Sequence, residues 1–96
     1  MNAARVARLI PRTVALFRLS EIRYGIEAVS EGRLLSQSSL WRWCDLAEIA
    51  TGKVEFTESE FNQLAAIAVA YRRGMKTQQI LEELTREQNA HQATPG

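Results

Sequence analysis

The chain has few of the residue types from which catalytic and metal sites are built. It contains one cysteine, Cys44, and one histidine, His91. A single cysteine excludes an internal disulfide and suits a reducing compartment. The sequence also lacks a glycine-rich phosphate loop and any metal-ligand spacing. We therefore expect a protein that is not an enzyme, needs no cofactor or metal and takes no small-molecule substrate, with Cys44 in the core and no catalytic role for His91.

Long apolar runs are missing as well. The longest stretch of purely apolar residues covers only residues 64–71, far short of the roughly 20 residues that a membrane helix needs. The arginine-rich N-terminus is not followed by the apolar region of a secretory signal, although an organellar transit peptide has a similar composition. We expect no membrane association and a cytoplasmic location.

Charge of one sign does not dominate, because the net charge is only +1. This near-neutral balance weighs against a dedicated nucleic-acid binder. The charge is unevenly placed, however: residues 1–42 hold seven arginines against three glutamates, and residues 43–96 hold five basic against eight acidic residues. Arginine suits bidentate contacts to phosphate and guanine. An arginine bias can also follow from a GC-rich genome, so both interpretations stay open.

The segment 58–73 carries the strongest helix pattern in the chain. Thr57 and Glu60 have the spacing of a capping box, and Phe56 and Phe61 have the spacing of a hydrophobic staple. Gly74 supplies a stop. Because residues 64–71 are all apolar, we expect this helix to be covered on several sides and to form the centre of the core.

Shorter helical patterns surround this segment. One is expected to begin at Ser20 and end at Gly32, a second to cover residues 37–50 behind a Ser36 cap, and a last one to begin at Thr77. The predicted fold is all-α, a compact bundle of four to five short helices around the central apolar helix 58–73. The alternation in residues 53–56 indicates a short extended connector, a candidate minimal wing.

The same patterns divide the chain into three parts. Residues 1–18 are expected to form a basic N-terminal arm or helix, and residues 19–84 a helical core domain. Residues 85–96 are polar and lack apolar periodicity, so we expect a flexible tail there.

The start of the helix predicted at 37–50 is the best candidate for function. Gln37, Ser38 and Ser39 are small or polar, and Arg42 follows one turn later. Short side chains let a helix enter the major groove, where arginine can bind guanine O6 and N7. Alternatively, these residues only form a soluble helix start. Nearby, Trp41 and Trp43 cannot face the same side, so one should lie in the core and the other against a neighbour or at an interface.

Three sequence stretches resemble a known family. LSEI at residues 19–22, SQSSLWRW at 36–43 and KVEFTESEF at 53–61 are similar to MerR-like winged-helix domains and the related AlpA/excisionase proteins. The resemblance covers residues 19–84. It implies a helix-turn-helix-like segment in which Ser38, Ser39 and Arg42 occupy recognition positions and Lys53 lies near the wing. The connection between Val29 and Ser36 is longer than the family's turn.

Two functions follow as hypotheses. The first is a small DNA-binding transcriptional regulator or excisionase-like protein, expected to be a homodimer. The second is a helical module that binds a protein partner, such as a phage- or plasmid-type inhibitor, an adaptor or an assembly protein. The DNA-contacting residues of the first would be Arg33, Gln37, Ser38, Ser39, Arg42 and Lys53. The protein-binding residues of the second would be Tyr24, Trp41 and Trp43.

Overall fold

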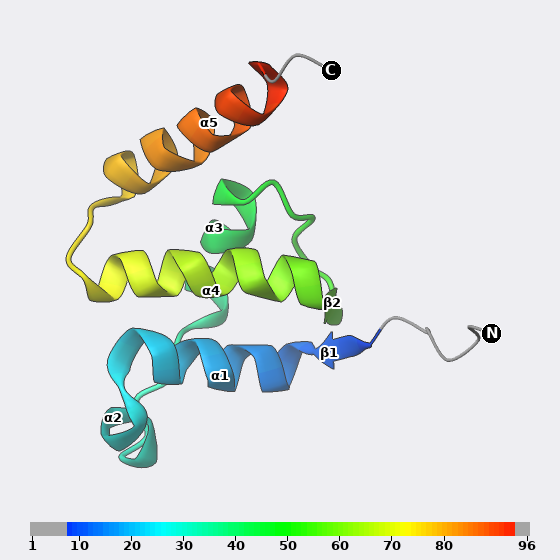
Figure 1. Cartoon of the computed structure of the whole chain (residues 1–96). Coiled ribbons are helices and arrows are strands. Elements are labelled where there is room, and N and C mark those ends of the chain that lie inside the picture. The colour runs from blue at the N-terminus through cyan, green and yellow to red at the C-terminus, as the bar shows by residue number, and fades with distance from the viewer. Residues whose placement is uncertain (1–7, 94–96) are drawn as a thin grey trace.

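The computed structural model describes the backbone of residues 8–93 and the side chains of residues 8–86. Over this range the chain forms five helices and two short strands, so the predicted all-α fold is confirmed (Figure 1). The elements are β1 (Leu9–Pro11), α1 (Arg12–Tyr24), α2 (Ile26–Ser30), α3 (Gln37–Leu46), β2 (Glu55–Thr57), α4 (Glu58–Arg72) and α5 (Thr77–Ala93).

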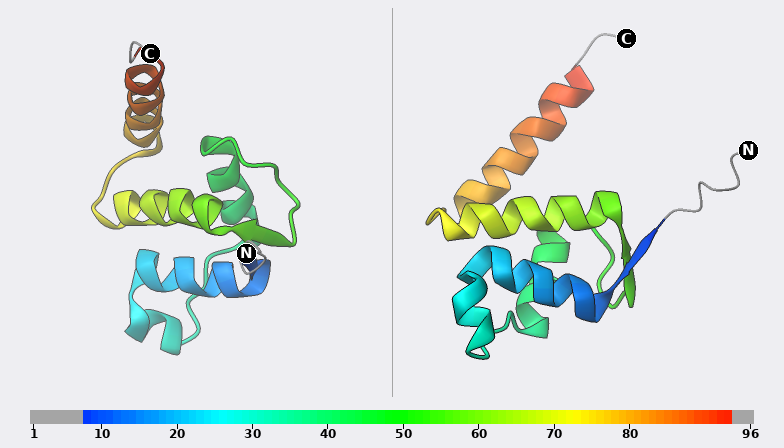
Figure 2. Two further views of the ribbon diagram at one scale, coloured as in Figure 1. Left: turned by 45° about the vertical axis from the view of Figure 1, so that its right-hand side comes forward. Right: turned by 60° about the horizontal axis from the view of Figure 1, so that its bottom comes forward.

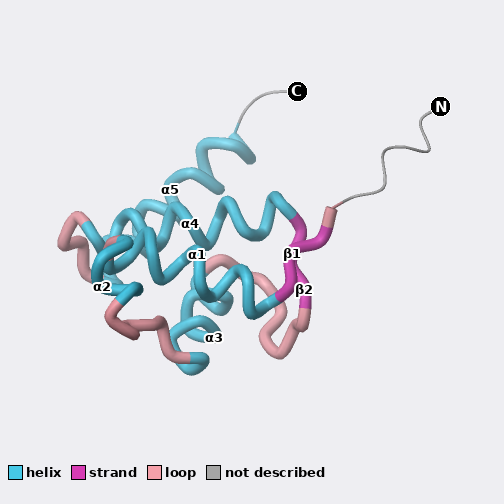
Figure 3. The backbone as a smooth tube through the Cα atoms, turned by 90° about the horizontal axis from the view of Figure 1, so that it is seen from below, coloured by secondary structure: helices cyan, strands magenta, loops and turns pink. Residues whose placement is uncertain are grey.

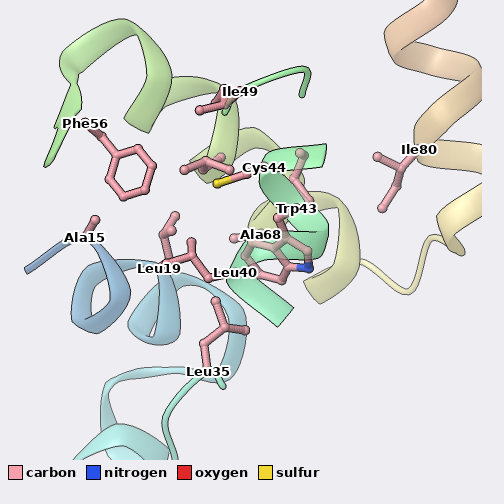
Figure 4. Packing of buried hydrophobic residues seen from close by; sticks show 12 residues of the cluster. Ala15, Leu19, Leu35, Leu40, Trp43, Cys44, Ile49, Phe56, Ala68 and Ile80 are labelled. Atoms are coloured by element: carbon pink, nitrogen blue, oxygen red, sulfur yellow. The ribbon is translucent and has the colours of Figure 1, made fainter. Parts of the chain in front are cut away.

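Helices α1 and α4 form the main layer of the fold. They start together at the strand pair β1–β2 and run side by side in the same direction (Figures 1 and 2). Helix α3 packs along this pair, and the two strands lie at one end of the molecule (Figure 3). The core lies between these elements. Its buried apolar residues are Ala15, Leu19, Leu35, Leu40, Trp43, Cys44, Ile49, Phe56, Leu64, Ile67, Ala68 and Ile80 (Figure 4).

Helix α4 begins as predicted. The Thr57 hydroxyl accepts a hydrogen bond from the Glu60 backbone N–H at 3.1 Å, and the Glu60 carboxylate accepts one from the Thr57 N–H at 2.9 Å. This reciprocal capping box satisfies two backbone donors that the first turn would otherwise leave free. Phe56, just before the cap, is fully buried, and Phe61 packs against the core.

The apolar stretch of α4 is covered less completely than its sequence predicts. Leu64, Ile67 and Ala68 are buried, but Ala66 is exposed and Val69 keeps 38% of its surface accessible. The expectation that the helix is covered on several sides is therefore only partly right. The physical reason is α5, which reaches the core through Ile80 but then rises away from α4 (Figure 1).

Helix α1 begins earlier than predicted. It follows Pro11 directly, and the Arg12 N–H donates to the Val54 carbonyl at 2.8 Å. Ser20, the expected cap, instead lies buried inside the helix. Its hydroxyl donates to the Leu16 carbonyl at 2.7 Å and accepts from the Leu35 N–H at 2.8 Å. Ser20 therefore does not start a helix; its hydroxyl connects α1 to the segment before α3 by a hydrogen bond.

Gly25 divides the helix that was expected between Ser20 and Gly32. Its φ of +100° is strained for residues with a Cβ, so α1 ends there and α2 begins at Ile26. The Gly25 N–H still donates to the Glu21 carbonyl at 2.8 Å. The single helix expected between Ser20 and Gly32 is therefore two helices that meet at Gly25.

Helix α3 ends at Leu46 instead of continuing to residue 50. Glu48 takes a φ of 60°, and the Ile49 N–H donates back to the Cys44 carbonyl at 2.8 Å. This pattern closes a helix with a left-handed residue. Here the residue is not glycine, which is why the sequence did not mark the end. Turning the chain back places Ile49 in the core.

The segment predicted as a minimal wing is part of a strand pair. Residues 55–57 pair antiparallel with β1, with Ile10 opposite Phe56. The strand therefore closes the base of α1 and α4 and does not project as a free hairpin. The β1 partner lies within the predicted N-terminal arm, of which residues 1–7 lie outside the described part of the chain.

The last helix extends further than its apolar pattern indicates. Helix α5 runs to Ala93, whereas no helix was predicted for residues 85–93, which were expected to form part of a flexible tail. Arg, Glu, Gln and Ala residues in this stretch are good helix formers, and intrinsic propensity outweighs the missing apolar stripe. The His91 side chain and residues 94–96 lie outside the described part.

Candidate nucleic-acid interface

The first turn of α3 is fixed by its cap. The Ser36 hydroxyl accepts from the Ser39 N–H at 3.1 Å and donates to the Ser39 hydroxyl at 3.0 Å. Gln37 and Ser38 are exposed at this end, whereas Ser39 is half-buried and already has a hydrogen-bond partner. The turn is thus held rigidly, with Ser38 rather than Ser39 free to meet a ligand.

Ser38 and Arg42 lie one helical turn apart on the exposed side of α3. The opposite side of the helix carries buried Leu40, Trp43 and Cys44. Within the described part of the chain, no carboxylate lies within salt-bridge distance of Arg42. Asp45, also exposed, follows on the same side about one turn later. The outward surface of α3 therefore presents a small hydroxyl, a cation and an anion in order.

The two tryptophans face different sides, as predicted. Trp43 is buried and stacks on Tyr71 of α4, with ring centroids 5.5 Å apart and an interplanar angle of 17°. Trp41 is half-buried, and the Arg12 guanidinium of α1 lies 5.6 Å from its ring centroid. This contact brings a second arginine next to the exposed side of α3.

A cluster of arginines and tyrosines lies at the far ends of α1 and α4. The guanidinium carbons of Arg33 and Arg23 lie 4.4 and 5.1 Å from the centroid of the Tyr24 ring. Arg23 also lies 6.0 Å from the Tyr71 ring. Arg72 donates to the Ile22 carbonyl at 3.1 Å. We call these residues, Arg23, Tyr24, Arg33, Tyr71 and Arg72, the arginine–tyrosine cluster.

Only Arg33 and Tyr24 of this cluster were candidates from the sequence. Arg23, Tyr71 and Arg72 could not be found there, because Arg72 meets Ile22 across 50 positions of the chain. No periodicity or motif reports such a contact. The only sequence signal was the excess of arginine in the first 42 residues.

Lys53 is not part of the exposed surface of α3. Its ammonium lies 2.6 and 2.7 Å from the two carboxylate oxygens of Glu60, at the start of α4. This hydrogen bond, together with the one from the Thr57 N–H, lowers the pKa of Glu60 below its ordinary value. The charge of Lys53 is therefore matched inside the fold.

Cys44 has the properties of a core residue. Burial raises the pKa of its thiol to about 11, so the thiolate that a nucleophile needs is disfavoured. In the residues that the structure describes, no group of histidine, cysteine, aspartate or glutamate side chains is arranged to hold a metal ion. Over the same residues, no helix has the length and apolar character to cross a membrane.

Comparison with known proteins adds no assignment, since no family model, curated protein or solved structure matches the chain.

Proposed function

We propose that this protein binds double-stranded DNA and reads it with the first turns of α3. The observation that carries the proposal is the exposed pair Ser38 and Arg42 on a helix capped by Ser36, with no carboxylate within salt-bridge distance of Arg42 in the described part of the chain. Arg12 lies beside Trp41 of the same helix, and Arg33 precedes the Ser36 cap by three residues. The resemblance of residues 19–84 to MerR-like and excisionase proteins supports the same role.

The chemistry of the exposed side fits a groove contact. The short side chain of Ser38 leaves room for the helix backbone to approach the base edges. Arg42 can donate two hydrogen bonds to guanine, and Asp45 can accept one from cytosine N4. Arg12 and Arg33 supply cations for the phosphates on either side, and these contacts would make binding salt-dependent.

The proposal is tested with a duplex selected from a random-sequence library on the full-length protein. Fluorescence anisotropy should show that Arg42→Ala weakens binding to the selected duplex by 1–3 kcal/mol, roughly 5- to 150-fold, with less effect on unrelated duplexes. Arg86→Ala serves as the control, because Arg86 is an exposed arginine on α5 that pairs with Glu83. It should bind like the wild type. Absence of DNA binding even at low salt would contradict the proposal.

Binding as a homodimer belongs to the same proposal. Two copies would present two α3 helices to half-sites about one DNA turn apart. Light scattering should then give twice the 10.8 kDa chain mass, either alone or on DNA. A mass of one chain in both conditions would contradict this part.

A protein-binding function is the second candidate. Trp43 is buried, Trp41 lies beside Arg12 and Tyr24 beside two arginines, so the residues first considered for it are all engaged within the chain. The observation in its favour is different: Phe17 and Val14 are 48% and 39% exposed on α1. A stoichiometric protein partner that survives nuclease treatment and is lost in Phe17→Ser would support this function instead.

A further inference from the structure

We propose that the arginine–tyrosine cluster is a phosphate-binding site for the DNA backbone, next to the part of α3 that reads the bases. This inference rests on the proposed DNA-binding function and deepens it. Arg33 lies three residues before the Ser36 cap of α3 and connects the two surfaces.

The cluster gathers three arginines, none of which has a carboxylate within salt-bridge distance among the described residues. Arg23 and Arg33 both lie over the same Tyr24 ring, so their guanidinium carbons are separated by less than the sum of the two ring distances, 5.1 and 4.4 Å. The Arg72 guanidinium reaches the adjacent Gly25 and Ile22. The salt bridges of the described residues join only Lys53 to Glu60 and Arg86 to Glu83. An anion held between these arginines would relieve their mutual repulsion.

The tyrosine rings lie close to the guanidinium groups of Arg23 and Arg33 and accept no hydrogen bond from them. A guanidinium over an aromatic ring is held through its flat face, and its N–H groups then point outward in the plane. For Arg23 and Arg33, no hydrogen-bond acceptor within the described part of the chain engages those N–H groups, while Arg72 keeps one bond to Ile22. Planar N–H pairs of this kind bind the oxygens of a phosphate in bidentate fashion. Tyr24 itself is engaged by both cations, which disfavours a role as a stacking platform for a base.

The site's position suits a continuous double helix rather than a small ligand. It draws on α1, the segment before α3 and the end of α4, and Arg33 and Arg72 are exposed. A helix whose first turn enters a groove brings its N-terminal flank close to the sugar–phosphate backbone. Arg33 occupies that flank, and Arg23 and Arg72 extend it.

The test measures the affinity for a generic duplex as a function of salt. Each of Arg23→Gln and Arg33→Gln should reduce the slope of log K against log salt by about 1 and lower affinity at 0.1 M salt about 5- to 10-fold, equally for all sequences. Arg18→Gln is the matched control. It removes an exposed arginine from α1 five residues before Arg23, about 140° around the helix, and should keep the wild-type slope.

Two variants of Tyr24 separate orientation from charge. Tyr24→Phe keeps the ring and should bind like the wild type, whereas Tyr24→Leu keeps every arginine but should lose affinity about as much as Arg33→Gln does. Circular dichroism should show that each variant remains helical. Because Arg33 is exposed, Arg33→Gln tests the phosphate site without changing a half-buried side chain such as Tyr24 or Arg23.

The outcomes distinguish this inference from the proposed function. If Arg42→Ala loses sequence preference while Arg23→Gln and Arg33→Gln keep the wild-type salt slope, the phosphate site is wrong and the reading helix stands. If the two cluster variants lose slope but Arg42→Ala has no effect on any duplex, the phosphate site stands and α3 is not the reader. A wild-type protein that binds no duplex at low salt overturns both.

Discussion

At the scale of single residues, Glu60 connects two separate parts of the fold. Its carboxylate caps the start of α4 through the Thr57 N–H and at the same time binds the Lys53 ammonium that precedes β2. One side chain therefore fixes both the helix start and the strand that leads into it. The capping part follows from sequence spacing, whereas the Lys53 contact needs the turn of the chain before β2.

This arrangement predicts a pH dependence. The pKa of Glu60 is lower in the folded protein than its ordinary value of 4.5. The carboxylate therefore contributes stability that is present above pH 4.5 and is lost as the pH falls through the lower, folded pKa. In Glu60→Gln, the free energy of unfolding should be lower at neutral pH and should fall less between about pH 5 and pH 3.

Urea unfolding at about pH 5 and pH 3 measures this change in the free energy of unfolding. Glu58→Gln is the control, since it removes an exposed carboxylate from the same helical turn without touching the capping box. It should retain the acid dependence of the wild type. An equally steep acid dependence in Glu60→Gln would show that the Lys53 and Thr57 contacts do not determine the titration of Glu60.

At the scale of elements, the position at which α3 ends determines which of the residues that follow it are buried. Helix α3 stops at Leu46 because Glu48 adopts a left-handed backbone conformation, and the chain then returns Ile49 to the core. The exposed end of α3 is its first turn. A left-handed conformation costs an ordinary residue roughly 1–2 kcal/mol relative to its right-handed form. Burial of Ile49 offsets this cost.

Glycine at this position should therefore stabilise the protein. Glu48→Gly removes the strain of the left-handed conformation, and we expect a gain of about 0.5–1 kcal/mol in the free energy of unfolding. Glu31→Gly is the control, because Glu31 caps α2 with an ordinary φ of −90° and should lose stability with glycine. Urea unfolding of both variants checks the prediction. A loss in Glu48→Gly as large as that in Glu31→Gly would contradict it.

The elements also show where sequence patterns are sufficient. The capping box of α4 and the Ser36 cap of α3 are local features, and the structure confirms them. The misjudged boundaries depend on contacts between distant segments. Serine is a residue type typical of helix caps, but Ser20 is buried and accepts a hydrogen bond from the Leu35 N–H. The segment before Thr57 pairs with β1. Neither partner can be inferred from local periodicity.

For the candidate site, the sequence and the structure contribute different parts. Gln37, Ser38 and Arg42 were chosen from their residue types at a predicted helix start and, for Ser38 and Arg42, from the family resemblance, and all three are exposed. The structure adds Arg12 and the arginine–tyrosine cluster through contacts between helices. It also pairs Lys53, which was expected to contact DNA near the wing, with Glu60.

At the scale of the whole molecule, three different surfaces surround one core. The first is polar and comprises the exposed side of α3 and the arginine–tyrosine cluster. The second is a groove between α4 and α5 with a volume of about 550 Å³, lined mostly by apolar residues such as Val69, Met75 and Leu84 but also by Arg73 and Glu83. Val14 and Phe17 form a third surface on α1. A DNA-binding protein should use the first of these, and a protein-binding module the second or third.

The most direct test follows the backbone amide signals of the full-length protein by NMR during titration with the selected duplex. DNA reading by α3 predicts that the largest shifts fall in residues 33–42, with further shifts at Arg23 and Arg72 and little change at Val69 or Phe17. Shifts confined to the α4–α5 groove or to Val14 and Phe17, or no shifts at low salt, would contradict it.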